Sequence, residues 1–524
     1  MSFLDLEKAD PEWSQPSPSS LIVCEHDVNG TPFAFFSGEY SRNLKRTLQS
    51  PDHENYFGAV QRRGSTIQNL INIFLPTGFP DSVQSDYLDY QIYDSVQAFS
   101  SSIAGLLANR CVLVAMGVGN STETSTSALF LKILQETVGR LGTIMFAWRL
   151  GSTLEPECKK FRFVADIIND AAIVFDCMSP MFPGNRNSKV ILMCASGILR
   201  SICGVMAGGS RAALTQHFTH PTKGSIADVN AKDQSQETVI TLMGMLVGSV
   251  VIGKVEGEGL YMWVVLLSLL TIHLWTNYNA VASVIMQTIN RQRANILFSD
   301  IIRILPELES NMSGGSLDNS KSGLSKLIMS PRSVASRERI LEWDGVLRWY
   351  ETSFNKPDSV LGYANFVGFS DILNVLHQQS FSISLLDLMS CCSTELNGYL
   401  IWFQVLHGTN RVEVKICLTK DNDIPDSEVS LKSSGTKTQE KTELRAWCHA
   451  LLIAKYIGTS PGKSPTTASD YMECIRHTEA TVDNIFGQLQ IMDNFRLAGW
   501  DIERCAIISA PTKSISIKSK VGIL

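Results

Sequence analysis

The chain has 524 residues, of which 44% are hydrophobic and 18% are charged, and its formal net charge is −6. The hydrophobic content excludes a mostly disordered chain, and the acidic balance argues against a dedicated nucleic-acid-binding protein. Because the charged fraction is below the roughly 25% of ordinary soluble domains, the composition indicates a globular protein that is partly membrane-associated, or one with an unusually apolar core.

Residues 1–64 mix charges of both signs with turn-forming residues, and we expect a flexible region in which only residues 21–36 resemble a short hairpin. The first residues show neither the apolar core of a secretory signal nor the Arg-rich helix of a transit peptide. The 12 cysteines include no Cys-x-x-Cys pair, which favours reduced thiols. We therefore expect an intracellular membrane location, in an organelle that the sequence does not specify.

Charged residues become sparse over residues 65–303, where uncharged runs predict membrane-spanning helices. The run 259–290 has no Asp, Glu, Lys or Arg, and it exceeds the roughly 20 apolar residues that a span requires. The run 238–253 is at the lower limit of length. Weaker runs at 99–119 and 190–213 contain arginines and indicate either spans within a bundle or buried soluble helices. The pattern predicts a mainly α-helical, membrane-embedded or membrane-associated domain with two to five spans.

Two Gly-x-x-x-Gly motifs, at 204–208 and 244–248, lie within these apolar stretches. The spacing places both glycines of a motif on one helix face, where a neighbouring backbone can approach closely. We therefore predict close helix packing at both motifs, with the alternative that glycine is simply common in this part of the chain.

Beyond residue 303 the sequence predicts a linker followed by a soluble domain. Residues 304–338 are rich in Ser and Gly and aperiodic, which predicts a flexible linker. Residues 339–524 predict a small soluble α+β domain. Its signals are a hairpin at 398–418, a polar loop at 421–441, helices at 442–456 and 481–497, and a strand at 505–508.

Several motifs occur together, and in order, in the apolar region. They include Phe74-Leu-Pro-Thr-Gly-Phe-Pro-Asp-Ser-Val83, Arg162-Phe-Val-Ala-Asp-Ile-Ile-Asn-Asp170, Gly208-Gly-Ser-Arg-Ala-Ala-Leu-Thr-Gln-His-Phe218 and Asp228-Val-Asn-Ala-Lys-Asp-Gln-Ser-Gln-Glu237. In this combination, residues 65 to 300 resemble the root UVB sensitive family, also called domain of unknown function 647.

The resemblance implies a membrane protein without an assigned biochemical activity. Plant members of the family are linked to ultraviolet-B responses and vitamin B6 metabolism, and they act with other members as partners. The resemblance thus implies a non-enzymatic role in regulation or metabolite homeostasis, with membrane lipid and other family members as partners and no nucleic acid. Two alternatives stay open: a small-molecule carrier in an intracellular membrane, and a soluble scaffold or interaction protein.

The densest polar segment of the apolar region, residues 210–237, supplies a candidate ligand site. Ionisable groups beside membrane helices often mark a pathway or a ligand site. The stretch 208–211 is suited to present backbone N–H groups and a guanidinium to a small anionic ligand, although a solvated loop is the alternative. The candidate ligand-binding residues are Arg200, Arg211, His217, Asp228, Lys232 and Glu237.

A second candidate is a polar cavity. Arg162, Asp166 and Asp170 are spaced at i, i+4 and i+8 and share one stripe of a helix, while His273 lies in the middle of the most apolar run. Within a membrane bundle, such groups line polar cavities, as in proton-coupled carriers. The alternatives are the solvated side of an interfacial helix for the carboxylates and a packing role for the histidine. We therefore assign Asp166, Asp170 and His273 to a candidate polar cavity.

The sequence indicates no catalytic or metal-binding constellation. His217-x-x-His220 lacks the further ligands that zinc would need, and Pro221 ends the helix there. The hydrolase elbow, the dinucleotide-binding fingerprint and the kinase motifs are absent from the sequence. We therefore expect a protein that is not an enzyme and that has no catalytic residues, metal or cofactor.

Overall fold

The computed structural model describes a mostly helical protein with a few small sheets, as the sequence predicts. Its contacts divide the chain into two units, residues 1–85 with 218–238 and residues 86–217 with 239–524, and each is described by itself. The described residues are 22–26, 32–37, 45–47, 73–508 and 514–515, with gaps in the long stretch at 117–124, 183–185, 256–258, 313–326, 352–356, 382, 385–386, 389–397, 407, 420–431 and 460–464.

The first unit contains a small antiparallel sheet of β1 (Ile22–His26), β2 (Pro32–Ser37) and β3 (Lys45–Thr47). The pairing of β1 with β2 confirms the hairpin that the sequence predicts. The unit also contains residues 73–85 and the first part of α6 (Ile226–Lys254).

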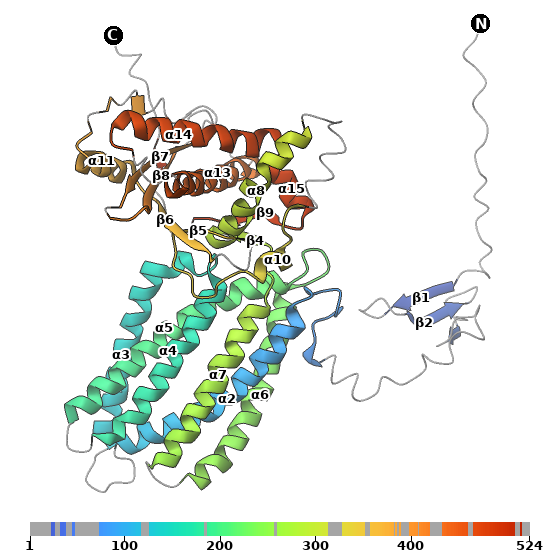
Figure 1. Ribbon diagram of the computed structural model, residues 1–524. Coiled ribbons are helices and arrows are strands. Elements are labelled where there is room, and N and C mark those ends of the chain that lie inside the picture. The colour runs from blue at the N-terminus through green and yellow to red at the C-terminus, as the bar shows by residue number, and fades with distance from the viewer. Residues whose placement is uncertain are drawn as a thin grey trace, which may run out of the picture. The chain divides into compact units, whose positions relative to one another are not determined.

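Long helices dominate the first half of the second unit (Figure 1). Within the described residues, four helices are long and apolar enough to cross a membrane, which falls within the predicted two to five. They are α2, α5, α6 and α7. The helices of this half are α2 (Tyr87–Ala115), α3 (Ser125–Leu150), α4 (Cys158–Met178), α5 (Arg186–Phe218), the second part of α6 and α7 (Leu260–Ser283), with short turns η2 (Gly151–Thr153) and η3 (Ser179–Met181) beside α4.

The central helix of this half is α4. Ile167 is the one exposed residue along its 21 residues. One side of α4 packs against α2 and α7, where Ile173 and Cys177 join a shared apolar cluster. Another side packs against α5 through Ala165 and Met206. A helix enclosed in this way holds its side chains away from the surroundings, including the charged ones.

Glycines permit close approach at one of the two predicted motifs. A Cβ atom at Gly244 or Gly248 of α6 would lie 2.7 Å from Ser102 or Leu106 of α2, respectively, so these glycines allow the two helices to touch. The prediction is therefore confirmed at 244–248. At 204–208 it is wrong for the described residues, because, apart from the adjacent backbone of α5 itself, no atom lies within 4 Å of a Cβ built on either glycine.

The second half of this unit is an α+β arrangement. Its main sheet has the order β10-β8-β6-β5, with β7 also paired to β8, and the antiparallel β7–β8 pair is the predicted hairpin. The strands are β5 (Val346–Trp349), β6 (Ser359–Phe366), β7 (Tyr399–Val405), β8 (Val412–Thr419) and β10 (Ser514–Ile515), and a separate parallel pair is formed by β4 (Thr288–Asn290) and β9 (Asp501–Ala506). The helices are α8 (Arg291–Met312), α10 (Pro331–Ala335), α11 (Phe369–Gln378), α13 (Lys432–Thr459), α14 (Ala468–Asp483) and α15 (Ile491–Leu497), with a short π turn η5 (Asn484–Gln488).

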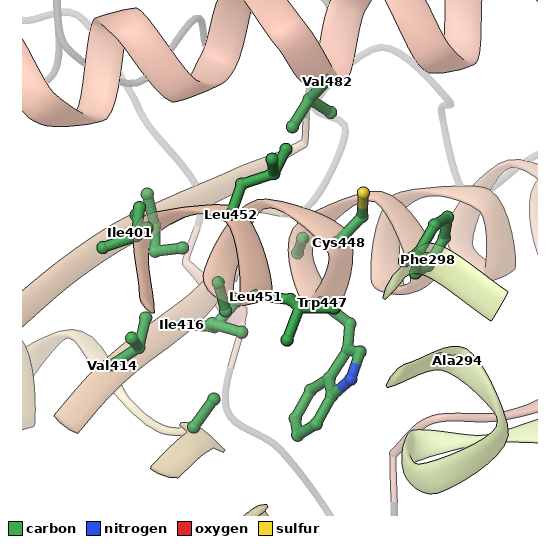
Figure 2. Close-up of a cluster of buried hydrophobic side chains, with 14 of the residues drawn as sticks. Ala294, Phe298, Ile401, Val414, Ile416, Trp447, Cys448, Leu451, Leu452 and Val482 are labelled. Atoms are coloured by element: carbon green, nitrogen blue, oxygen red, sulfur yellow. The ribbon is translucent and has the colours of Figure 1, made fainter. Parts of the chain in front are cut away.

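Helix α13 forms the centre of the core of this α+β half (Figure 2). Its Trp447 and Leu451 are completely buried, and the surrounding side chains come from the sheet, α8 and α14. Because this helix is apolar around most of its circumference, it can be covered on several sides at once. Labelled neighbours in Figure 2 are Phe298 of α8, Ile401 of β7, Val414 and Ile416 of β8, and Val482 of α14.

Three boundaries differ from the sequence predictions. Helix α8 continues to Met312 and the side chain of Glu338 is only 6% exposed, so both ends of the predicted linker 304–338 belong to the folded structure. Helix α13 begins at Lys432, ten residues before the predicted start. The predicted helix 481–497 is interrupted at Gln490, whose left-handed backbone (φ 45°) separates η5 from α15. Tertiary packing extends or breaks helices beyond what local periodicity shows.

Candidate functional site

A cluster of polar side chains lies buried among the apolar helices α2, α4 and α7. We call it the α4 cluster, because α4 supplies its central members. Its side chains come from neighbouring helices that contact each other pairwise. The cluster consists of Asp94 and Gln97 of α2, Arg162, Asp166 and Asp170 of α4, and His273 and Asn277 of α7.

The helical spacing explains the alignment within the α4 cluster. Residues four apart lie one above another on a helix, so Arg162, Asp166 and Asp170 form a stripe on α4, and His273 and Asn277 form a shorter one on α7. The two stripes face each other. The sequence-predicted residues Asp166, Asp170 and His273 are therefore together in the structure.

Asp166 lies in the middle of the cluster and accepts two amide hydrogen bonds. Gln97 Nε2 donates to its Oδ2 at 2.5 Å, and Asn277 Nδ2 donates to the same oxygen. His273 Nε2 lies 4.0 Å from this oxygen. The carboxylate is thus held from α2 and α7 at once, so it ties three helices together.

Asp170 has a different environment. Its Oδ1 lies 2.9 Å from His273 Nδ1, which is an ion-pair distance. However, neither carboxylate oxygen of Asp170 nor His273 Nδ1 has a partner in hydrogen-bond geometry among the described residues. Buried polar atoms in this state are rare, and each calls for a functional or structural explanation.

Ion pairs occur along α4 both within the cluster and on either side of it. Within the cluster, Arg162 Nη2 donates to Asp94 Oδ1 at 2.8 Å. Toward the end of the helix, Asp176 Oδ2 accepts hydrogen bonds from Arg200 Nη2 at 2.6 Å and Nε at 3.2 Å. At the start, Lys159 Nζ lies 2.5 Å from Glu338 Oε2. Buried charges therefore run along the whole length of α4, which is about 30 Å at 1.5 Å per residue.

Glu338 connects this helix to the α+β half. Besides Lys159, its carboxylate accepts a hydrogen bond from Arg293 Nε at 2.6 Å. Burial alone would raise the pKa of Glu338, but the charges of Arg293 and Lys159 outweigh it, and the pKa is lowered from its ordinary value. The carboxylate therefore stays ionised between two cations.

His217, one of the candidate ligand-binding residues, is paired with Asp86. Its Nε2 lies 2.9 Å from Asp86 Oδ2, and the backbone N–H of Ile285 donates to the same oxygen at 2.6 Å. Burial acts to raise the pKa of Asp86, but His217 and the Ile285 N–H act to lower it. The lowering effects outweigh the burial, so the net shift of the pKa is downward. This node joins the end of α5, the start of α2 and the segment after α7.

Asp228 and Lys232 belong to the first unit, where they hold residues 73–77 along α6. Thr77 N–H donates to Asp228 Oδ2 at 2.7 Å, and Lys232 Nζ donates to the carbonyl of Ile73 at 2.8 Å. Gln236, one helical turn further on, donates to the carbonyl of Phe74 at 2.6 Å. These side chains thus hold the backbone of residues 73–77 along α6.

The remaining candidates are distributed along the helices. Arg200 forms its ion pair with Asp176, Arg211 lies half-buried on α5, and Glu237 lies half-buried on α6. Within the second unit, Arg200 and His217 contact different carboxylates and do not share one site. In the described part of the chain, no group of three or more His, Cys, Asp or Glu side chains is arranged to hold a metal ion.

Three members of the α4 cluster were missed by the sequence reasoning. Asp94, Gln97 and Asn277 complete it from α2 and α7. A weak signal was present, because Asn277 follows His273 at i+4 within an apolar run, and Asp94 and Gln97 are spaced at i, i+3 in an apolar helix. Spacing alone does not reveal which of these faces meet.

Comparison with known proteins identifies the helical region. Residues 60–304 match the model of a family described as the vitamin B6 photo-protection and homoeostasis domain. A protein named RUS family member 1 from Dictyostelium discoideum is 39% identical over 253 residues, which are 48% of this chain and 47% of the relative. Protein root UVB sensitive 3 from Arabidopsis thaliana is 36% identical over 264 residues, or 50% of this chain and 58% of the relative.

Protein root UVB sensitive 5 from the same plant is 27% identical over 297 residues, 53% of this chain and 56% of that protein. The matched stretch thus spans about half the length of these curated relatives. No solved structure matches the chain. Residues 60–304, just under half of the chain, therefore match the family model, and the same region is similar to proteins of the root UVB sensitive family.

Proposed function

We propose that this chain is a membrane-embedded, non-enzymatic protein that acts in vitamin B6 homeostasis in an intracellular membrane. The vitamin B6 part of the proposal rests on the description of the family domain that residues 60–304 match. The membrane part of the proposal rests on the chain's own helices.

One observation carries the membrane proposal: helices of spanning length expose large apolar side chains. Leu246 of α6 is 63% exposed, and Leu260 and Trp275 of α7 are 81% and 63% exposed. Contiguous apolar surface of this kind is unfavourable in water and favourable against lipid tails. The exposed set on α6 and α7 includes Leu242, Met243, Met245, Leu246, Val247, Val250, Leu260, Tyr261, Val264, Leu267, Ile272, Trp275 and Tyr278.

Extraction of cell membranes with alkaline carbonate tests this proposal on the full chain. We expect the protein to stay in the membrane pellet and to be released by detergent. Recovery in the carbonate supernatant would contradict the membrane proposal, and it would favour the alternative of a soluble scaffold whose helices are covered by a partner.

The homeostasis part is tested in cells that lack the protein. We expect their pyridoxine and pyridoxal phosphate contents to differ from those of the parent cells and to return when the full chain is supplied. If the pyridoxine and pyridoxal phosphate contents change neither when the protein is lost nor when it is supplied again, a role in vitamin B6 homeostasis is contradicted, whatever the extraction result.

The α4 cluster favours a second candidate function, that of a small-molecule carrier. Ionisable groups inside a membrane bundle are costly and usually mark a path for ions or solutes. The carrier proposal predicts that Asp170→Asn reduces uptake of labelled pyridoxine into vesicles containing the purified protein. Asp89→Asn, which changes an exposed carboxylate on α2, is the matched control and should leave uptake unchanged.

A regulator without carrier activity would behave differently. It would show no protein-dependent uptake in the vesicle assay, and it would act by binding partners, which we propose to be other members of the same family. Co-purification of two differently tagged copies from one membrane preparation tests self-association, and recovery of one tag alone would contradict it.

A further inference from the structure

The charge balance of the α4 cluster is incomplete. Asp94, Asp166 and Asp170 supply three carboxylates, while Arg162 and His273 are the basic members. Even when His273 is protonated, one negative charge remains in excess. Asp166, Asp170 and His273 are each more than nine-tenths buried. An uncompensated charge at such a site is strongly unfavourable, so the cluster needs one more positive charge.

The missing charge belongs at Asp170. Asp94 is already paired with Arg162, and Asp166 already accepts hydrogen bonds from two amides. Asp170, which is 5% exposed, has no hydrogen bond at either oxygen among the described residues. It is therefore the carboxylate of the cluster whose two oxygens both lack a hydrogen bond among the described residues.

The surroundings of Asp170 favour a proton over a metal cation. Alkali and alkaline-earth cations require several oxygen ligands around one point. An imidazole nitrogen, His273 Nδ1, lies 2.9 Å from Asp170 Oδ1, and the amides of Gln97 and Asn277 present their N–H groups, which are donors, to Asp166. A proton needs one acceptor oxygen and no coordination shell.

We propose that the Asp170–His273 pair is a reversible proton-binding site inside the helical bundle, and that proton binding there is coupled to cargo movement. The coupling rests on the carrier function proposed above, whereas the proton site itself does not. The carboxylate of Asp170 takes up one proton to become a neutral carboxyl group, and it returns the same proton when the site opens. No other bond changes.

The charged and titratable groups around the pair are consistent with this role. From α2, Tyr90 and Asp94 lie close to Arg162, one turn of α4 from Asp166. From α5, Cys203 lies within electrostatic reach of Asp166, Asp170 and Arg200. From Thr238 to Gly253, α6 carries no charged residue. Arg200, whose side chain is 36% exposed, pairs with Asp176 beyond Asp170 on α4.

Infrared spectroscopy of the purified full chain in lipid tests the proton site directly. We expect difference spectra between acidic and alkaline pH to contain a carboxyl C=O band from a buried, protonated aspartate. Asp170→Asn should lose this band, and Asp89→Asn should keep it. If Asp170→Asn retains the band unchanged, the assignment is overturned.

A second variant keeps the test decisive if Asp170→Asn does not fold. His273→Gln removes the neighbouring imidazole but leaves the carboxyl group, so the band should persist and shift in frequency. A band of unchanged frequency overturns the pairing. A wild-type protein without any such band, but stabilised against heat by NaCl and not by choline chloride, overturns the proposal in favour of a sodium site.

The coupling is tested separately in vesicles that contain a pH-sensitive dye, with labelled pyridoxine as the probe. Coupled movement predicts that pyridoxine uptake changes the internal pH and that both signals are lost in Asp170→Asn. Uptake without a pH change overturns the coupling while the carrier function stands. Absence of pyridoxine uptake contradicts the proposed carrier function and overturns the coupling with it, and the infrared result then decides the proton site alone.

Discussion

Two buried histidines show how differently the two halves of the second unit treat a titratable group. In the α+β half, His449 Nδ1 lies 3.0 Å from Tyr399 Oη, and His449 Nε2 lies 3.0 Å from Thr478 Oγ1 and 3.2 Å from the carbonyl of Ile475. Burial lowers the pKa of His449 to about 4. A neutral imidazole with partners at both nitrogens is a structural element of the core.

His273 in the helical half is equally buried but faces two carboxylates. Its Nδ1 approaches Asp170 and its Nε2 approaches Asp166 and the amide of Gln97. The α+β half therefore neutralises its histidine by burial and hydrogen bonding, whereas the helical half surrounds its histidine with charge. Burial alone therefore does not distinguish a structural group from a functional one, because the difference depends on the hydrogen-bonding and charged partners of the group.

The largest expected effect on stability is at Glu338, a buried carboxylate with complete partners. Glu338→Gln leaves Lys159 and Arg293 as buried cations without a counter-charge, and breaking such a buried pair costs about 3–5 kcal/mol. Thermal unfolding in detergent measures this loss. Asp493→Asn, at a largely exposed pair with Arg496, should cost at most about 1 kcal/mol. Equal effects of the two variants would contradict the buried network.

Substitutions at His449 and His273 should affect different properties, stability at His449 and function at His273. His449→Ala removes several buried hydrogen bonds and leaves a cavity, and we expect a loss of roughly 2–4 kcal/mol. His273→Gln should change stability less and instead alter the carboxyl band and the uptake of pyridoxine. Unfolding and vesicle uptake measured on both variants check this division. The distinction fails if His449→Ala abolishes uptake at a temperature where it remains folded.

At Asp86 we expect a smaller effect on the free energy of unfolding, and one that depends on pH. The fold lowers its pKa, so the folded state binds this proton less readily than the unfolded chain does. Its stabilising contribution is complete above the unfolded value of about 4 and is lost as the pH falls through the folded value. Asp86→Asn should cost about 1–2 kcal/mol at neutral pH and flatten the acid side of the stability curve. Asp89→Asn serves as the control, and a curve of unchanged shape in Asp86→Asn would refute the assignment.

The smallest expected change in stability is at Asp170. Because its oxygens have no hydrogen bonds among the described residues, Asp170→Asn removes an excess charge while losing only the contact with His273. We expect the free energy of unfolding at neutral pH to change by less than about 1 kcal/mol, since replacing an unsatisfied buried charge by a neutral group can even stabilise. A loss as large as that of Glu338→Gln would mean that Asp170 is a structural ion pair.

Much of the fold was predictable from the sequence because the signals are local. The uncharged run 259–290 predicts α7, the alternating pattern at 398–418 predicts the β7–β8 hairpin, and the spacing of Asp166 and Asp170 predicts their shared stripe on α4. Helical and strand periodicities depend on neighbouring residues alone, so they can be read without the tertiary structure.

Contacts between residues that are far apart in the sequence could not be predicted, because periodicity describes only neighbouring residues. Gln97 and Asn277 reach Asp166 from other helices, and Glu338 enters a buried network from a stretch that reads as a linker. Lys232, a candidate ligand residue by composition, instead holds the backbone at Ile73. The sequence alone predicted the most apolar helices, the family resemblance and the stripe of charged residues on α4. The tertiary structure decided which of those charges are satisfied, because that depends on which faces pack together and on how completely water is excluded.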